Sequence, residues 1–402
     1  MHRHKVASAA LLALAVSATG ARAQDMPQHV EVHGFGSWNS GATNNANNYL
    51  GGQWKGSSLN SDAGLNLSGD LGDRVSFTTQ VKFDFDGATT PSLDYVFAEY
   101  KFADQLKLRA GQVKQPFGLL TEVQDIGTLH PFLSLPQSQY GPTGTVADAY
   151  RGIGFTGNLA LVRGVSLDYD VYGGGLNRSE NEFTLDMYRG LQGRKSWDDV
   201  SHEVGSEVTD QLYGGRFMFL LPIDGLRLGA SGYHSQTGEA QAGRGWVSTV
   251  GYALEYNANR TLFRSEVYRQ WENDHDRQNG WYYEGAYRVY RGWQLAGRFD
   301  RTTVHPKGAV PAVGKNGIPS VSFPVLGQSL LHHKELAGGL NYIFSPNFVM
   351  KASYHHVEGN HFAQPDAASA LAAYEAAAMA GSTTIPIPTK TNAVLLGAQF
   401  SF

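Results

Sequence analysis

The 402-residue sequence contains no cysteine, which excludes disulfide scaffolds, zinc–thiolate sites and cysteine nucleophiles. It also lacks a long hydrophobic run. The apolar stretch from Ala7 to Ala18 is too short for a membrane-spanning helix, which needs ~20 apolar residues, so a polytopic helical membrane protein is excluded. Charged residues make up only 17% of the chain, below the usual ~25%. The net charge is −4, and no basic run of the kind that binds nucleic acid is present.

Glycine, by contrast, is abundant. It accounts for 48 of the 402 residues, well above the usual ~7%, and aromatic residues add 12%. The glycines follow no Gly-X-Y period, so a collagen-like chain is excluded. The composition therefore indicates a glycine- and aromatic-rich β-protein.

The first 23 residues have the pattern of a secretory signal peptide. Arg3 and Lys5 precede the apolar stretch, and Ala21-Arg-Ala23 resembles a cleavage site of the A-x-A kind. We expect residues 1–23 to be removed on export and residues 24–402 to form one domain.

The rest of the chain alternates between apolar and polar residues. From Arg74 to Phe85, valine and phenylalanine occupy every second position on one face, and polar residues occupy the other. Successive side chains of a strand point to opposite faces, so the segment predicts a strand with one apolar and one polar face. Sixteen segments follow this pattern: 30–39, 58–69, 74–85, 93–102, 106–115, 151–160, 164–175, 209–221, 226–237, 246–257, 261–272, 280–290, 293–304, 334–344, 347–358 and 391–402.

The connections between these segments alternate between short turns and mostly longer loops. Arg291-Gly292 is one of the short turns, whereas segments 116–150, 176–208, 305–333 and 359–390 are long. This alternation over an even number of strands is typical of bacterial outer-membrane barrels. In hydrocarbon every backbone polar group must be paired, so a spanning sheet has to close on itself. We therefore predict an all-β, 16-stranded antiparallel transmembrane β-barrel with short periplasmic turns and long external loops.

The last strand supports an outer-membrane location in a Gram-negative bacterium. Val394, Leu396, Ala398, Phe400 and Phe402 all lie on one face. This end resembles the terminal strand that the barrel-assembly machinery reads, so we expect that machinery to be a partner through Phe402. Outer-membrane lipid and lipopolysaccharide are the expected surroundings of the apolar face.

Segment 116–150 is the third external loop, and it has no obvious secondary structure. Loops of this length are uncommon in compact folds and usually functional. In general porins this loop folds into the lumen, so we expect 116–150 to form a constriction, with an exposed flap as the alternative. A second segment, 365–380, is alanine-rich and predicts a short helix.

Strand parity divides the lumen-facing charges into equal numbers of basic and acidic residues, so we expect no strong ion selectivity. Arg264, Arg288 and Arg298 lie at similar expected depth on consecutive strands and could face the acidic loop across the lumen. Alternatively, Glu266 and Glu284 neutralise them across strands. The candidate pore-lining and constriction residues are Lys82, Arg109, Glu122, Asp125, Arg216, Arg264, Arg288 and Arg298.

Other motifs do not predict chemistry. Gly152-Ile-Gly-Phe-Thr-Gly157 matches a dinucleotide-binding pattern, but it opens a strand instead of a helix. His234 and Ser235 are successive residues of one strand and point to opposite faces, as do His355 and His356. The sequence therefore predicts no catalytic residues, no cofactor and no metal site.

The stretch Leu108-Arg-Ala-Gly-Gln-Val-Lys-Gln-Pro-Phe-Gly118 resembles the R-x-G-Q-x-K-x-P-F run of the phosphate-selective porin O and P family. The resemblance implies a trimeric diffusion channel. It carries over Arg109, Lys114, Pro116 and Phe117, whose implied role is to shape the start of the inward loop. Phosphate channels of this family carry basic residues in the constriction, whereas the third loop here is acidic.

We therefore expect a non-enzymatic, homotrimeric porin for the passive diffusion of small hydrophilic solutes and ions. One alternative is a substrate-specific channel for phosphate, another anion or small organic acids. Others are an outer-membrane barrel hydrolase and a structural or adhesive barrel with a plugged lumen.

Overall fold

The computed structural model describes residues 29–50, 58–85, 90–141, 149–178, 207–237, 246–272, 276–306, 331–365 and 387–402, together with residues 329, 376, 379 and 380. The expected signal segment 1–23 lies outside the described residues, as does most of the alanine-rich segment 365–380.

The described chain consists almost entirely of strands. These are β1 (Val30–Thr43), β2 (Asn47–Asn48), β3 (Ser58–Gly72), β4 (Val75–Asp84), β5 (Thr90–Ala103), β6 (Leu106–Lys114), β7 (Ala149–Ala160), β8 (Ser166–Arg178), β9 (Glu207–Leu220), β10 (Leu226–Thr237), β11 (Trp246–Ala258), β12 (Thr261–Glu272), β13 (Asp276–Tyr290), β14 (Trp293–Pro306), β15 (His332–Ser345), β16 (Phe348–Glu358), β17 (Gln364–Pro365) and β18 (Lys390–Ser401). Two short helical segments, η2 (Gly127–Leu129) and α2 (Gln137–Tyr140), lie between β6 and β7.

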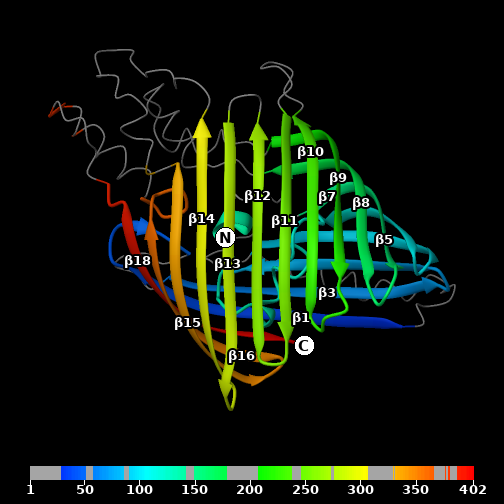
Figure 1. Cartoon of the computed structure of the whole chain (residues 1–402), viewed down its shortest axis with the longest axis horizontal. Helices are drawn as coiled ribbons and strands as arrows, with labels where there is room; N and C mark the ends of the chain where they lie inside the picture. Colours follow the sequence, from blue (N-terminus) through cyan, green and yellow to red (C-terminus); the bar gives the residue numbers. More distant parts are fainter. Residues whose placement is uncertain are drawn as a thin grey trace, which may run out of the picture.

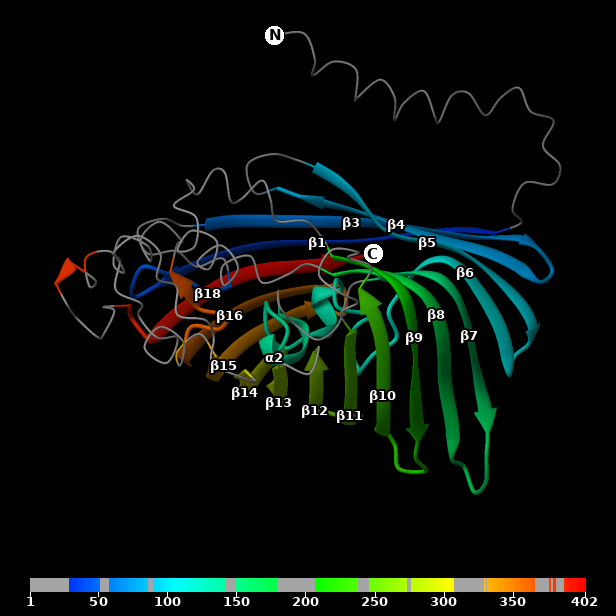
Figure 2. The same cartoon turned by 90° about the horizontal axis from the view of Figure 1, so that it is seen from above.

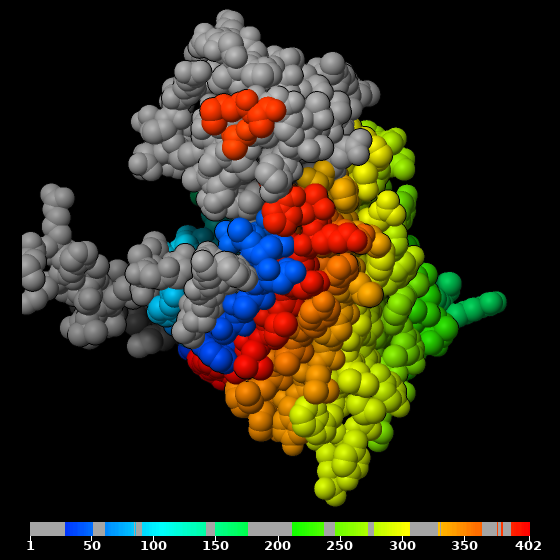
Figure 3. All heavy atoms as spheres, turned by 90° about the vertical axis from the view of Figure 1, so that its left-hand side faces the viewer, coloured from blue at the N-terminus to red at the C-terminus, as the bar shows by residue number. Residues whose placement is uncertain are grey.

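Sixteen strands form one closed antiparallel barrel, so the predicted fold class and strand count are confirmed (Figure 1). The barrel closes where β1 pairs with β18, and the two strands lie side by side on the outer surface (Figure 3). At this seam the backbone of Phe402 exchanges two hydrogen bonds with Gly34, at 2.9 and 3.0 Å. The absence of a side chain at Gly34 lets the Phe402 ring lie directly over this backbone. Strands β2 and β17 pair with each other outside the barrel sheet.

The alternation along each strand separates an apolar outer surface from a polar interior. On β18, Val394, Leu396 and Phe400 are exposed on the outside, whereas Thr391 and Gln399 are buried inside. A large apolar surface exposed in this way marks contact with lipid in a closed barrel. None of the described helices is long and apolar enough to cross a membrane.

Aromatic side chains gather at the short-turn end of the barrel, as expected for an interfacial girdle. Tyr342 lies between Trp293 and Phe344, with ring centroids 4.9 and 4.6 Å away. The adjacent turn is tight because Arg291 and Gly292 both have positive φ, 40° and 89°. This is the backbone that a two-residue hairpin between right-twisted strands requires.

Candidate functional site

The chain that follows β6 turns into the barrel and lies against its inner wall. In the view from above, α2 and its flanking segments lie inside the ring of strands (Figure 2). Phe117, Leu120 and Phe132 of this segment are almost fully buried. We call residues 115–141 the inner loop.

One end of the inner loop is fastened to β10 and β12. The backbone N–H of Gly118 donates to Ser231 Oγ at 3.0 Å, and that of Leu119 donates to Glu266 Oε1 at 3.0 Å. Tyr140, at the far end of the loop, donates its hydroxyl to Glu266 Oε2 at 2.6 Å. Glu266 therefore holds both ends of the inner loop with one carboxylate. Its neighbour Gly118 has φ +65°, and a Cβ there would lie 2.2 Å from Glu266 Oε1.

The middle of the inner loop is fastened to β14, β15 and β16. Arg298 donates to the Ser134 carbonyl at 2.6 Å and lies 4.4 Å from the Phe132 ring centroid. Lys351 donates to the carbonyls of Gly127 and Phe132, at 2.7 and 3.1 Å. These two cations donate hydrogen bonds to loop carbonyls and so fix the path of the inner loop.

The inner loop is also fastened to β15, where the side-chain amide of Asn341 donates a hydrogen bond to the carbonyl of Pro131 at 2.8 Å.

Both described carboxylates of the inner loop form ion pairs with the wall. Glu122 lies 2.6 Å from Arg216 and 3.7 Å from Arg109. Asp125 lies 2.6 Å from Lys82. Burial opposes the ionisation of Glu122, but the charges of Arg216 and Arg109 outweigh it and hold the pKa of Glu122 below its ordinary value.

Asp125 is in the same situation. Its second basic partner, Lys114, lies 3.0 Å away. Burial opposes ionisation, and the charges of Lys114 and Lys82 hold the pKa of Asp125 below its ordinary value. The carboxylates therefore stay ionised and keep the loop attached on this side.

The opposite wall carries a belt of alternating charges. In strand register, Arg227 faces Glu255, Glu255 faces Arg264, Arg264 faces Glu284, and Glu284 faces Arg298. The closest N–O distances along this belt are 2.5, 2.8, 3.9 and 2.6 Å in the same order. Cross-strand pairs of opposite charge stabilise a sheet and cancel each other's field.

This belt corrects the expected row of three arginines in two ways. Arg288 lies four residues along β13 from Glu284, towards the short turn, and is exposed away from Arg264 and Arg298. The loop carboxylates do not face Arg264 and Arg298 across the lumen, because the chain turns back after Leu119 and brings them to β4, β6 and β9.

The structure distinguishes between the two glutamates expected to neutralise the row. Glu284 pairs with Arg264 and Arg298, whereas Glu266 accepts hydrogen bonds from the inner loop and from Tyr282. The side chain of Arg298 is 0% exposed, since the inner loop covers it. Of the predicted residues, Lys82, Arg109 and Glu122 are more accessible, with side-chain exposures of 22, 23 and 40%.

Between the inner loop and the wall at β1 and β3 lies a cavity of about 360 Å³. Ser37, Ser61 and Asp62 line it from the wall, and Gln124 and Asp125 line it from the loop. The inner loop therefore narrows the lumen and leaves a polar space beside the wall at β1 and β3.

His130 lies where the inner loop meets this space. Its Nε2 lies 2.8 Å from the carbonyl oxygen of Val123, and the side chain is buried. Burial, together with the charges of Arg264 and Lys351, lowers the pKa of His130 to about 3. The ring is therefore neutral at physiological pH.

Sequence reasoning missed Glu266 and Lys351 as loop anchors. Both were placed on the inner face by parity, but parity does not tell which loop group a side chain meets. The dinucleotide-like motif lies within β7, where Gly152 packs against the backbone of Gly173 in β8 rather than against a loop. His234 bonds Ser248 instead of Ser235, at 2.7 Å.

Residues 60–184 match the family model of phosphate-selective porin O and P. The whole chain is similar in structure to an anion-selective porin from Comamonas acidovorans, with 10% identity, a TM-score of 0.56, and coverage of 93% of this chain and 99% of that one. The chain has the fold of outer-membrane porins, and residues 60–184 resemble the phosphate-selective porin family.

Two further structures have the same fold. OmpF of Salmonella typhi, solved with daunomycin, is 12% identical, with a TM-score of 0.55 and coverage of 94% of this porin and 100% of OmpF. The outer-membrane channel DcaP of Acinetobacter baumannii is 11% identical, with a TM-score of 0.52 and coverage of 93 and 97%. No curated protein sequence matches this porin. Barrels of 16–18 strands leave an aqueous lumen, so fold and family resemblance both support an outer-membrane channel.

Proposed function

We propose that this porin forms a water-filled channel for the passive diffusion of small hydrophilic solutes and ions, with weak ion selectivity. The observation that carries the proposal is the polar space left beside the anchored inner loop. The pairing of the loop carboxylates with wall cations supports weak selectivity, since paired charges give a small net field. Discrimination then depends on the size of the opening, no bond is made or broken, and the protein acts without an enzyme activity or cofactor.

The surroundings follow from the outer surface. We propose that residues 1–23 direct export, that the barrel-assembly machinery recognises the exposed Phe402, and that the apolar outer surface contacts lipid and lipopolysaccharide.

We also propose a homotrimer. One structural relative, OmpT of Vibrio cholerae, was solved in a trimer form, with 10% identity and a TM-score of 0.52. Light scattering in detergent tests this assembly: three copies per particle are expected, and a stable monomer would contradict it.

A second candidate is a phosphate-specific channel, which the family match over residues 60–184 favours. Such a channel needs cations that face the solute path without carboxylate partners. Arg109 and Lys82 are partly accessible beside the inner loop, Arg216 is largely buried there, and each of the three lies within 4.0 Å of a carboxylate oxygen. This pairing supports the general channel over the phosphate-specific one.

Liposome swelling separates the two candidates. Purified porin in liposomes is expected to admit neutral sugars at rates that fall smoothly with sugar size. Added phosphate should not change those rates or block the chloride current. A saturable block by phosphate would support the specific channel, and liposomes impermeable to every solute would refute both.

A further inference from the structure

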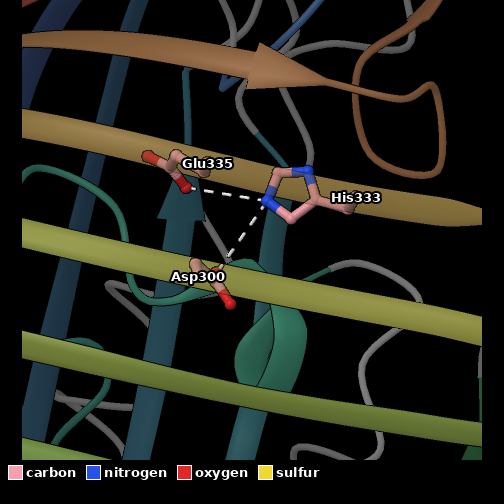
Figure 4. Close-up of side chains that lie close together, drawn as sticks. All are labelled: Asp300, His333 and Glu335. Carbon is pink, nitrogen blue, oxygen red and sulfur yellow. Dashed lines mark ion pairs between the residues drawn. The ribbon is translucent and has the colours of Figure 1, made fainter.

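A buried cluster of two carboxylates and one histidine lies between β14 and β15, next to Arg298 at the end of the charged belt. Asp300 on β14 is the direct cross-strand partner of Glu335 on β15, and His333 lies two residues from Glu335 on the same face (Figure 4). All three side chains are 0% exposed. Two carboxylates placed directly opposite each other repel, and burial makes this repulsion costly unless a cation lies between them.

The cluster contains polar atoms that have no hydrogen-bond partner. Both ring nitrogens of His333 and Oδ1 of Asp300 are buried and without a partner in the described part of the chain. His333 Nε2 points between the carboxylates, 3.9 Å from Asp300 Oδ2 and 3.7 Å from Glu335 Oε2 (Figure 4). These distances are too long for hydrogen bonds. A buried imidazole with two free nitrogens indicates a missing ligand, because buried polar groups are normally paired.

The spacing of the three groups suits a metal ion. One ligand atom from each residue lies within 4.8 Å of the others. Tetrahedral Zn²⁺, with bonds of ~2.0–2.2 Å to nitrogen and oxygen, separates its ligands by roughly 3.4 Å. The two histidine–carboxylate distances, 3.9 and 3.7 Å, exceed this separation by a few tenths of an ångström, and the carboxylate–carboxylate distance exceeds it by at most about 1.4 Å, so side-chain movements would bring the three atoms onto one ion. An imidazole with two carboxylates favours a first-row divalent ion over Ca²⁺ or Mg²⁺, which prefer oxygen ligands alone.

Neighbouring groups already orient the carboxylates. Tyr49 donates its hydroxyl to Glu335 Oε2 at 2.7 Å, and His355 bonds the other oxygen of Glu335. The backbone N–H of Ser138, in α2 of the inner loop, donates to Asp300 Oδ2 at 3.1 Å. Such outer contacts are typical of metal centres, where they fix the direction of the ligands.

We propose that Asp300, His333 and Glu335 form a binding site for a divalent first-row metal ion, represented by Zn²⁺. The ion neutralises the paired carboxylates and joins three parts of the molecule. These are the wall at β14 and β15, the inner loop through Ser138, and the segment between β1 and β3 through Tyr49. It is therefore a structural clamp on the inner loop. The site could not be predicted from the sequence, because Asp300 and His333 are far apart along the chain and come together only through strand register.

The test is Zn²⁺ binding to the full-length porin, stripped with a chelator and measured by calorimetry and metal analysis with Mg²⁺ in excess. One Zn²⁺ per chain is expected. His333→Ala and the near-isosteric Asp300→Asn should each weaken binding at least tenfold. Tyr49→Phe, which removes only an orienting contact, should weaken it ~10–100-fold. The control His356→Ala removes a partly exposed histidine of β16 and should bind like the wild type.

Co²⁺ supplies an independent readout. Co²⁺ bound to the wild-type porin should show visible absorption bands of an ion with imidazole and carboxylate ligands. These bands should be absent when Co²⁺ is added to Asp300→Asn. Far-UV circular dichroism identifies variants that fail to fold. The proposal is overturned if the wild-type porin binds no Zn²⁺. It is also overturned if folded Asp300→Asn and His333→Ala bind Zn²⁺ like the control.

Discussion

Glu266 offers the sharpest test of how the inner loop is held. Its carboxylate accepts hydrogen bonds from the Leu119 N–H, the Tyr140 hydroxyl and the Tyr282 hydroxyl, at 3.0, 2.6 and 2.5 Å. The first two come from the loop. Removing the acceptor leaves each buried donor without a partner, which costs ~1–3 kcal/mol per donor, and water in the lumen offsets part of that loss. Taking ~1.5 kcal/mol for each of the two loop donors, Glu266→Ala should cost about 3 kcal/mol of loop attachment.

This cost predicts a measurable local opening. A loss of about 3 kcal/mol raises the population of the detached loop roughly 100-fold, because each ~1.4 kcal/mol is a factor of ten. Hydrogen exchange at the Leu119 amide should accelerate by that factor, and open-channel current should become noisier. The control is Glu358→Ala, which removes a carboxylate at the long-loop end whose ion-pair partners among the described residues are Lys334, Lys390 and His356. If Glu266→Ala exchanges no faster than this control, Glu266 does not hold the loop.

Four further substitutions test the site. Glu122→Gln removes one negative charge beside Arg216, which keeps Asp170 as a partner at 2.8 Å. One unit of charge at roughly 8 Å in water acts with ~0.5 kcal/mol on a passing ion, so the anion-to-cation permeability ratio should rise about fivefold. An unchanged ratio would place Glu122 off the ion path. Arg298→Gln should raise current noise without moving the reversal potential, since the inner loop covers that side chain. Gly118→Ala should raise loop exchange as Glu266→Ala does, because of its positive φ and the clash with the carboxylate; wild-type exchange would contradict this. The pKa of His130 is about 3 in the attached loop and ~6.5 in the released loop. The contribution of neutral His130 to the free energy of loop attachment is therefore fully present above pH 6.5 and is lost as the pH falls towards 3. Current noise should therefore grow between pH 6.5 and 4, and His130→Asn should abolish that growth; noise that persists in His130→Asn assigns it to another group.

The barrel was predictable from the sequence because its physical cause is local. A strand between lipid and water must alternate at every residue, and the last strand shows this from Val394 to Phe402 without any knowledge of its neighbours. The same parity placed Arg264, Glu266 and Arg298 on the inner face. The closure of β1 on β18 follows from the requirement that no strand edge faces hydrocarbon.

The partners of these residues were not predictable, since they depend on strand register and on the path of the inner loop. Parity cannot decide whether Glu266 meets an arginine or the Leu119 amide, and the choice depends on where the chain turns after Gly118. The depth of each charge along the barrel axis was also not predictable. Arg288 lies on the same strand as Glu284 but four residues nearer the short turn. Register therefore determines which charges cancel.

The measurement that tests the central claim most directly is the reversal potential of single channels in a planar bilayer under a KCl gradient. The account predicts stable open channels, because a polar space of about 360 Å³ remains beside the inner loop, and a reversal potential close to zero, because the loop and wall charges are paired. A reversal potential near the limit for pure chloride conduction, or no conductance from folded protein, would contradict it.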